Sequence, residues 1–241
     1  MITSKTKAYI LFEEKMPNQN LSCAHEGFKN LGADVILLYK QSKINEIKDF
    51  GYDVVMCGYI QDVCMALNSI GIESPKAIDY PDCLKPFFKR EINTCSLKNI
   101  RAASGSVFIK PVKHKLFTGL VFDDSEKSRR LIVDIPDDTE VYYSNTIEII
   151  SEHRAFILNG SILDVRRYTG DWSVAPDKAF VEEVVRSYKN PPAAYTADIG
   201  VLKDGTNILI EINDGFSFGS YGLRPEFYAQ MLHARWNELV K

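Results

Sequence analysis

The sequence has little of what would place it outside the ordinary globular proteins. Its 241 residues contain no low-complexity tract and no internal repeat, and hydrophobic and charged residues make up 45% and 25% of the chain, as in a folded domain. Lys and Arg number 29 against 32 Asp and Glu, and no basic run concentrates the positive charge. We therefore expect neither nucleic acid nor an anionic membrane as a partner.

Long apolar segments and paired cysteines are missing as well. The apolar stretch Ala8–Phe12 is too short for a signal-peptide core, and nothing approaches the roughly 20 residues of a membrane span, so we expect a cytoplasmic protein. The five cysteines show no C-x-x-C pair and no nearby histidine at metal-ligand spacing, which predicts buried free thiols. These cysteines are Cys23, Cys57, Cys64, Cys83 and Cys95.

Glycine-based nucleotide signatures are also absent, because the chain has no Walker-type loop and no G-x-G-x-x-G after its first apolar run. The first third nevertheless alternates strand-like and helix-like patterns. Strands are predicted at Lys7–Phe12, Asp34–Tyr39 and Tyr52–Cys57, with helices at Leu21–Leu31 and Gln61–Ile70. This alternation predicts a parallel, Rossmann-like unit that binds no dinucleotide.

After Pro86 the pattern changes from alternation to pairs of strands, which predicts a mixed α/β (α+β) chain. The expected strands are Ser106–Lys110, Leu116–Phe122 and Glu140–Tyr143, followed by two tight hairpins, with helices at Pro176–Tyr188 and from about Pro225 to Val240.

The second of these hairpins, Thr196–Asn213, gathers oxygen-bearing side chains. Asp204-Gly205 predicts a two-residue type I′ turn, and the register that follows puts Asp198 opposite Glu211 and Ile199 opposite Ile210. Asp198, Glu211 and Asn213 then share the polar face, and such hard ligands suit Mg²⁺ completed by phosphate oxygens. The hairpin alone is equally compatible with a solvated outer face.

The first hairpin turns at Asn159-Gly160 and brings arginines together. Its two-residue register places Glu152 opposite Arg167, with Arg154 on the same face. These groups form either a surface salt-bridge ladder or a site for a phosphate or carboxylate, which the planar guanidinium group binds through parallel hydrogen bonds.

A lysine at the end of a strand changes the interpretation of both hairpins. Lys110 closes the run Phe108-Ile109-Lys110-Pro111 and precedes the D-x-G and E-x-N segments at Asp198–Gly200 and Glu211–Asn213. In this order, together with Glu152-His153-Arg154 and Arg166-Arg167, the segments resemble the ATP-grasp superfamily, and most closely its R-two-K clade of small single-chain members. The resemblance covers Tyr80–Leu223.

The resemblance implies a Rossmann-like unit at residues 1–80, a small ATP-grasp lobe and hinge at 81–150, and a large lobe with the metal site at 151–241. It also implies a role for each matching residue. ATP phosphates would be contacted by Lys110, with Lys89 and Lys115. The hinge beside adenine would be Glu140, Val141, Tyr142 and Tyr143, and Glu148 would meet the ribose. Mg²⁺ would be bound by Asp198, Glu211 and Asn213, and phosphate and the substrate carboxylate by Arg154 and Arg167, with Arg166 as a further candidate.

The implied activity is an ATP- and Mg²⁺-dependent carboxylate–amine ligase that forms an amide through an acyl phosphate and releases ADP. Its substrates would be small-molecule or peptide acids and amines. Two alternatives stay open: an ATP-grasp kinase for a small molecule, and a non-catalytic ATP-binding regulator.

The segment Gly215–Gly219 also fits the G-x-S-x-G pattern of serine hydrolases. Only His233 follows it, so we prefer a glycine-rich loop beside the metal site that contacts substrate through Ser217, Ser220 or Tyr221.

Overall fold

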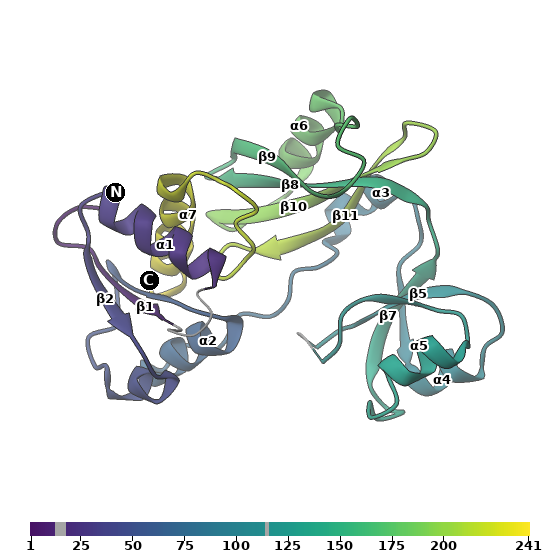
Figure 1. Ribbon diagram of the computed structural model, residues 1–241, viewed down its shortest axis with the longest axis horizontal. Coiled ribbons are helices and arrows are strands. Elements are labelled where there is room, and N and C mark those ends of the chain that lie inside the picture. Colours follow the sequence, from purple (N-terminus) through teal and green to yellow (C-terminus); the bar gives the residue numbers. More distant parts are fainter. Residues whose placement is uncertain (13–17, 114–115) are drawn as a thin grey trace.

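The computed structural model describes residues 1–12, 18–113 and 116–241, and three sheets organise them (Figure 1). The first sheet is parallel, with strand order β2-β1-β3. Its strands are β1 (Lys7–Leu11), β2 (Asp34–Leu38) and β3 (Val54–Cys57), and its helices are α1 (Gln19–Asn30) and α2 (Ile60–Ser69). The predicted Rossmann-like unit is confirmed, because each expected strand and helix lies within a few residues of its predicted bounds.

The second sheet is antiparallel and has the order β4-β7-β5-β6. A linker containing the 3-10 helix Asp82–Leu84 and α3 (Lys85–Phe88) leads into it from the first unit. The sheet consists of β4 (Asn93–Ser96), β5 (Val107–Pro111), β6 (Leu120–Phe122) and β7 (Glu140–Asn145), covered by α4 (Leu97–Ala102) and α5 (Glu126–Leu131). It lies apart from the other two sheets at the lower right of Figure 1. Its small core includes Leu97, Ile109 and Val141.

The third sheet is antiparallel, with the order β11-β10-β8-β9. It contains β8 (Ile149–Leu158), β9 (Ser161–Gly170), β10 (Ala194–Leu202) and β11 (Asn207–Asp214). Helix α6 (Lys178–Ser187) packs its buried Val181 and Val184 on one face. This helix begins two residues later than predicted, because Asp177 and not Pro176 precedes its first turn, and the Asp177 carboxylate caps the Ala179 N–H at 2.9 Å.

The last helix, α7 (Pro225–Leu239), packs against α1 and lies near it in Figure 1. Gly27 permits this contact, because a Cβ atom there would lie 1.9 Å from the Pro225 carbonyl oxygen. Phe28 and Trp236 belong to one buried cluster that also includes Phe156 of β8. The first and third sheets thus share a core, whereas the β4–β7 sheet has a core of its own. No helix in the described part of the chain is both long and apolar enough to span a bilayer.

Candidate functional site

A cavity of about 860 Å³ lies between the β4–β7 sheet and the β8–β11 sheet. Side chains from both sheets line it, among them Phe108 and Lys110 of β5 and Asp198 and Glu211 of the β8–β11 sheet. Its volume falls within the range usual for small-molecule sites. The end of β7, the start of β8 and the segment that joins them form another part of its wall, through Ser144, Asn145, Thr146, Ile147 and Ile149.

A row of charged residues crosses one face of the β8–β11 sheet. Strand pairing places Glu211 opposite Asp198, Asp198 opposite Arg154, and Arg154 opposite Arg166. The predicted pairing of Asp198 with Glu211 is therefore confirmed. The predicted pairing of Glu152 with Arg167 is wrong, because bulges in the β8–β9 ladder set Glu152 opposite Thr169.

Arg154 and Asp198 form a buried bidentate ion pair at the centre of this row. Arg154 Nε and Nη2 each donate to a different Asp198 oxygen at 2.7 Å, with 7% and 3% of the two residues exposed. Burial raises the pKa of the Asp198 carboxyl and Arg154 opposes that rise. The guanidinium group also lies 4.9 Å from the ring centre of Tyr221, which stacks on Tyr168. These contacts hold the guanidinium group in one orientation directly behind Asp198, Tyr168 and Tyr221, which line the cavity.

Lys110 reaches across the cavity from the β4–β7 sheet to the β8–β11 sheet. Its Nζ donates to Glu211 Oε2 at 2.6 Å and also forms an ion pair with Asp79. Burial lowers the pKa of Lys110, but Glu211 and Asp79 outweigh burial and raise it. In turn Lys110 lowers the pKa of Glu211 despite burial. The Tyr80 ring lies 5.5 Å from Nζ, so the lysine is held charged inside the cavity.

Sequence reasoning missed Asp79, which lies in the linker before the β4–β7 sheet. Its backbone carbonyl accepts a hydrogen bond from the Ile212 N–H at 2.9 Å, and its φ of 47° is left-handed, which Asp tolerates better than most residues. Asp79 thereby connects β11 with Lys110 of β5. No local pattern could have identified it, because the contact joins a loop residue to distant strands.

The three predicted metal ligands converge on one another. Asn213 Nδ2 donates to Glu211 Oε1 at 3.1 Å and lies 3.3 Å from Asp198 Oδ2, so a positively polarised group already lies between two carboxylates. This donor set suits a hard cation, and rotation of the amide would present its oxygen instead. Among the described residues no cluster of three His, Cys, Asp or Glu side chains suits a metal, so the set is two carboxylates and an amide. Mg²⁺ commonly uses so few protein ligands because phosphate oxygens supply others.

The structure places Arg90, and not the predicted Lys89, at the cavity. Lys89 is exposed and ends α3 with a left-handed φ of 53°, whereas the next residue turns inward. Arg90 Nη2 donates to the Ile210 carbonyl at 3.1 Å. Both residues belong to the run Phe87–Arg90, so the sequence did indicate a basic residue at this place. The left-handed conformation of Lys89 determines which of the two side chains faces the cavity.

The predicted hinge is displaced along the chain. Glu140, Val141, Tyr142 and Tyr143 form the first part of β7, which pairs with β4 on one side and β5 on the other, and Val141 is buried. The link between the sheets is instead residues 146–148, of which Thr146 and Ile147 line the cavity. Glu148 lies within this link and is exposed. Extended sequence alone did not distinguish a central strand from a connection.

The remaining candidate residues lie elsewhere. Arg166 is half exposed at the outer end of the charged row and pairs with Asp164 at 2.6 Å. Arg167 lines a different cavity on the sheet's other face, where its Nη1 donates to the Gly170 carbonyl at 2.8 Å. Lys115 lies outside the described residues. Arg154 is buried beside the cavity of Lys110, where it contacts the lining residues Asp198 and Tyr221, whereas Arg167 lies on the other face of the sheet.

The structure does not form a serine hydrolase site, because Ser217 and His233 have different hydrogen-bond partners. Ser217 Oγ donates to the Gly58 carbonyl at 3.0 Å, whereas His233 Nε2 lies 2.7 Å from Asp53 and 3.0 Å from Asn237. Ser217 and Tyr221 do line the cavity, while Ser220 is buried against Asn20 of α1.

Comparison with known proteins agrees with this architecture. The model of the ATP-grasp domain, R-two-K clade family 2, matches residues 87–231, more than half of the chain. The chain belongs to this family. No curated protein matches the chain closely enough to count as a relative.

Among solved structures, D-alanine–D-alanine ligase from Bacillus anthracis complexed with ATP superposes with a TM-score of 0.56 at 13% identity, covering 98% of this chain and 96% of that one. The ADP complex of purK, N5-carboxyaminoimidazole ribonucleotide synthetase, superposes with a TM-score of 0.64 at 10% identity, covering 98% of this chain and 78% of that one. A RimK domain ATP-grasp protein from Sphaerobacter thermophilus superposes with a TM-score of 0.57 at 15% identity, covering 97% of this chain and 99% of that one. At these identities the likeness establishes the fold: a Rossmann-like unit followed by an ATP-grasp fold.

Proposed function

We propose that this protein is an ATP- and Mg²⁺-dependent carboxylate–amine ligase. The observation that carries the proposal is the meeting of Lys110 from one sheet with Glu211, Asn213 and Asp198 from the other, inside a cavity of about 860 Å³. A cationic side chain facing a set of oxygen ligands is what a nucleotide triphosphate with its magnesium ion requires. The fold shared with solved ATP-grasp ligases supports the same reaction class.

In this proposal Asp198, Glu211 and Asn213 hold Mg²⁺, which when bound neutralises negative charge on the β- and γ-phosphates. Lys110 exchanges its two carboxylate partners for phosphate oxygens. The lining residues around the β7–β8 link and Ile210 would lie beside the base. The exposed Glu148 of this link stays our candidate for the ribose hydroxyls.

The chemistry then has two steps. A carboxylate oxygen of the acid attacks the γ-phosphorus and ADP leaves, giving an acyl phosphate. The amine nitrogen attacks the acyl carbon, loses a proton, and expels phosphate to give the amide. Arg154 lies behind the cavity lining, where its two bonds to Asp198 and its contact with Tyr221 would fix the Asp198 carboxylate beside the reacting groups and add positive potential to the site. The acid and amine are small molecules or peptides.

The test combines binding with product analysis. We would measure ATP affinity by calorimetry with Mg²⁺ and with EDTA, for the natural protein, for Lys110→Ala and for Glu211→Gln combined with Asn213→Ala. The exposed Lys98 of α4 provides the matched control Lys98→Ala. Both site variants should bind Mg-ATP at least tenfold more weakly, while the control should not change. Unchanged affinity in both site variants, or binding that needs no Mg²⁺, would contradict the site.

Incubation with Mg-ATP and pooled acids and amines then identifies the reaction. The ligase produces ADP together with a new mass equal to acid plus amine minus water. ADP formed only with hydroxyl acceptors would indicate a kinase, and saturable ATP binding without ADP formation would indicate a binding module. Either outcome overturns the proposal.

A further inference from the structure

A second cavity lies on the other face of the β8–β11 sheet and has no part in the proposed reaction. It measures about 1110 Å³ and runs between β9, α6 and the segment Trp172–Pro176. We call it the β9–α6 groove. Because the sheet separates it from Lys110 and Glu211, a molecule bound here cannot reach the phosphates of a bound nucleotide.

The groove follows the free edge of β9. In the sheet order β9 comes last, and its only strand partner in the described part of the chain is β8. Every residue from Ser161 to Val165 lines the groove. Successive side chains of a strand point to opposite faces, so a cavity that touches all of them runs along the strand's edge. An unpaired edge offers main-chain donors and acceptors to another extended chain, and on this edge the Val165 N–H already donates to Asp164 Oδ1 at 2.8 Å, so an incoming strand would pair with the remaining groups.

The unpaired charges of the groove are positive. Its acidic residues already have partners, since Asp164 binds Arg166 at 2.6 Å and Glu182 lies 3.5 Å from Lys178. Arg167 and Arg186 also line the groove, and neither has an ion pair among residues 1–12, 18–113 and 116–241. An acidic segment would therefore find two guanidinium groups without a carboxylate partner there, of which Arg167 also donates to the Gly170 carbonyl.

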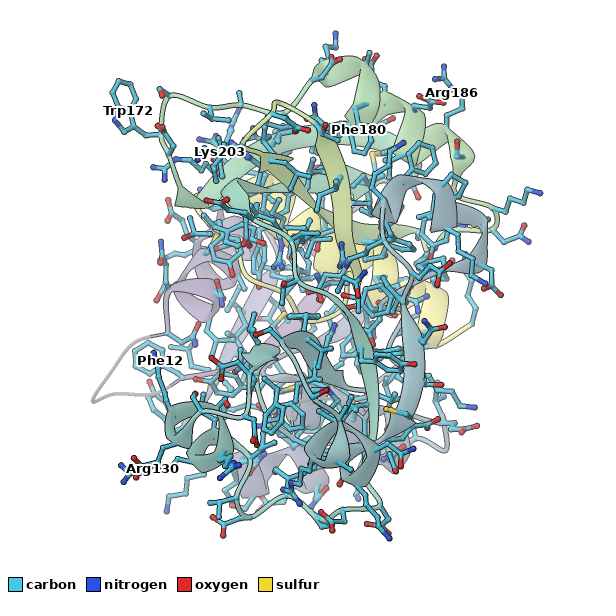
Figure 2. All side chains as sticks on the ribbon, turned by 90° about the vertical axis from the view of Figure 1, so that its right-hand side faces the viewer. Phe12, Arg130, Trp172, Phe180, Arg186 and Lys203 are labelled. Atoms are coloured by element: carbon cyan, nitrogen blue, oxygen red, sulfur yellow. The ribbon has the colours of Figure 1, made fainter. Side chains whose placement is uncertain are left out.

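Two further side chains lack the partners that their chemistry calls for. Trp172 is 83% exposed at the rim, where Figure 2 shows its ring standing clear of the ribbon. His153 lines the groove with 5% of its surface exposed, and its Nδ1 has no hydrogen-bond partner within the described ranges. An exposed indole and a buried unsatisfied imidazole are both uncommon features of a surface that stays bare.

We propose that the β9–α6 groove binds an extended acidic peptide segment of a partner protein, which adds a strand to the free edge of β9. The five residues Ser161–Val165 span about 17 Å at roughly 3.3 Å per residue, so the bound segment comprises about five or six residues. Carboxylates of the segment pair with Arg167 and Arg186, and an apolar side chain packs on Trp172. This site anchors a partner and is independent of the proposed ligase chemistry.

The test begins with an array of fluorescein-labelled hexapeptides that carry acidic residues at alternate positions and all twenty residues elsewhere, with a matched lysine array as control. Binding is measured by fluorescence anisotropy on the full chain. The tightest acidic peptide is then made in two N-methylated forms, methylated at the odd or at the even residues. Only one set of N–H groups points toward β9, so one form should lose at least tenfold in affinity and the other should retain it.

Protein variants locate the site. Exposed ion pairs contribute about 0.2–1 kcal/mol, so Arg167→Gln and Arg186→Gln should each weaken binding by roughly 1.4-fold to fivefold. Arg130→Gln is the control, because Arg130 is 77% exposed on α5 of the other sheet (Figure 2). Absence of any acidic peptide that binds better than the lysine array overturns the proposal, as does equal binding of both N-methylated forms. Binding of a free acidic amino acid as tightly as of the peptide would indicate a small-molecule site instead and would also overturn it.

Discussion

Replacing Lys110 by methionine tests the charge arrangement of the cavity without any ligand. Side-chain exposure is 20% for Lys110, 7% for Asp79 and 21% for Glu211, so methionine leaves two poorly hydrated carboxylates without their cation. Breaking a buried ion pair by removing one partner costs about 3–5 kcal/mol. The residual exposure of these groups favours the lower end, about 3 kcal/mol, which lowers the melting temperature by roughly 6–12 °C in a chain of this length.

The cost of Lys110→Met should depend on pH in a defined direction. In the natural protein burial raises the pKa of Glu211, but Lys110 lowers it below the ordinary 4.5, so this carboxylate stabilises the fold above that pH and loses its effect as the pH falls. In the variant burial is opposed only by the weaker effects of Asn213 and Arg154, so the pKa of Glu211 rises relative to the natural protein. The stability that this carboxylate contributes above pH 4.5 is therefore reduced. The penalty is therefore largest near pH 7.5 and smaller at pH 5.

Urea unfolding followed by tryptophan fluorescence at both pH values measures this penalty, with Lys98→Met as the control. Adding Glu211→Gln to Lys110→Met should recover part of the lost stability, because one of the unpaired charges is then removed. A Lys110→Met protein within about 0.5 kcal/mol of the natural one at pH 7.5 would refute the reasoning, since changes of that size are typical of featureless surface sites. Equal penalties at pH 7.5 and 5 would refute it as well.

Three other predictions follow from single contacts. Arg154→Lys should destabilise the fold by about 1.5–3 kcal/mol in urea unfolding, because lysine cannot make both 2.7 Å bonds to Asp198; an unchanged midpoint would contradict the bidentate pair. Gly27→Ala should lower the melting temperature although alanine favours helices by about 1 kcal/mol, because its Cβ would meet the Pro225 carbonyl oxygen; a stabilised variant would disprove the close approach of α1 and α7. Ser217→Ala should leave every ATP-independent hydrolysis assay at background and alter Mg-ATP affinity by less than about twofold, since its hydroxyl bonds the Gly58 carbonyl and makes no contact with His233.

The elements of the fold could be predicted from the sequence where one local signal dominates. Asn159-Gly160 forms the predicted tight turn, with φ of 48° and 76°, because Asn and Gly both tolerate the left-handed region. Apolar alternation and helical spacing likewise located β1 and α7. A cluster of side chains on a single hairpin could be predicted for the same reason, and Asp198, Glu211 and Asn213 do converge in the structure.

Contacts between segments that are distant in the sequence could not be predicted from such local signals. Asp79 reaches Lys110 only because the linker crosses both sheets. Arg167 was assigned to the wrong face, because bulges between Glu152 and His153 and between Phe156 and Ile157 shift the ladder, and one step of register moves a side chain across the sheet. No residue pattern in β8 or β9 marks these bulges.

The β10–β11 hairpin shows that a correct prediction can rest on two compensating errors. The chain turns through Lys203, Asp204 and Gly205 with only Gly205 left-handed, so the predicted type I′ turn is wrong and Val201 pairs with Asn207 instead of Ile208. A bulge at Ile210 then restores the pairing of Asp198 with Glu211. Without that bulge the longer loop would place Ile210 opposite Asp198. The bulge also turns the Ile210 side chain into the cavity and its carbonyl toward Arg90, so the irregularity that alternation cannot predict is itself part of the site.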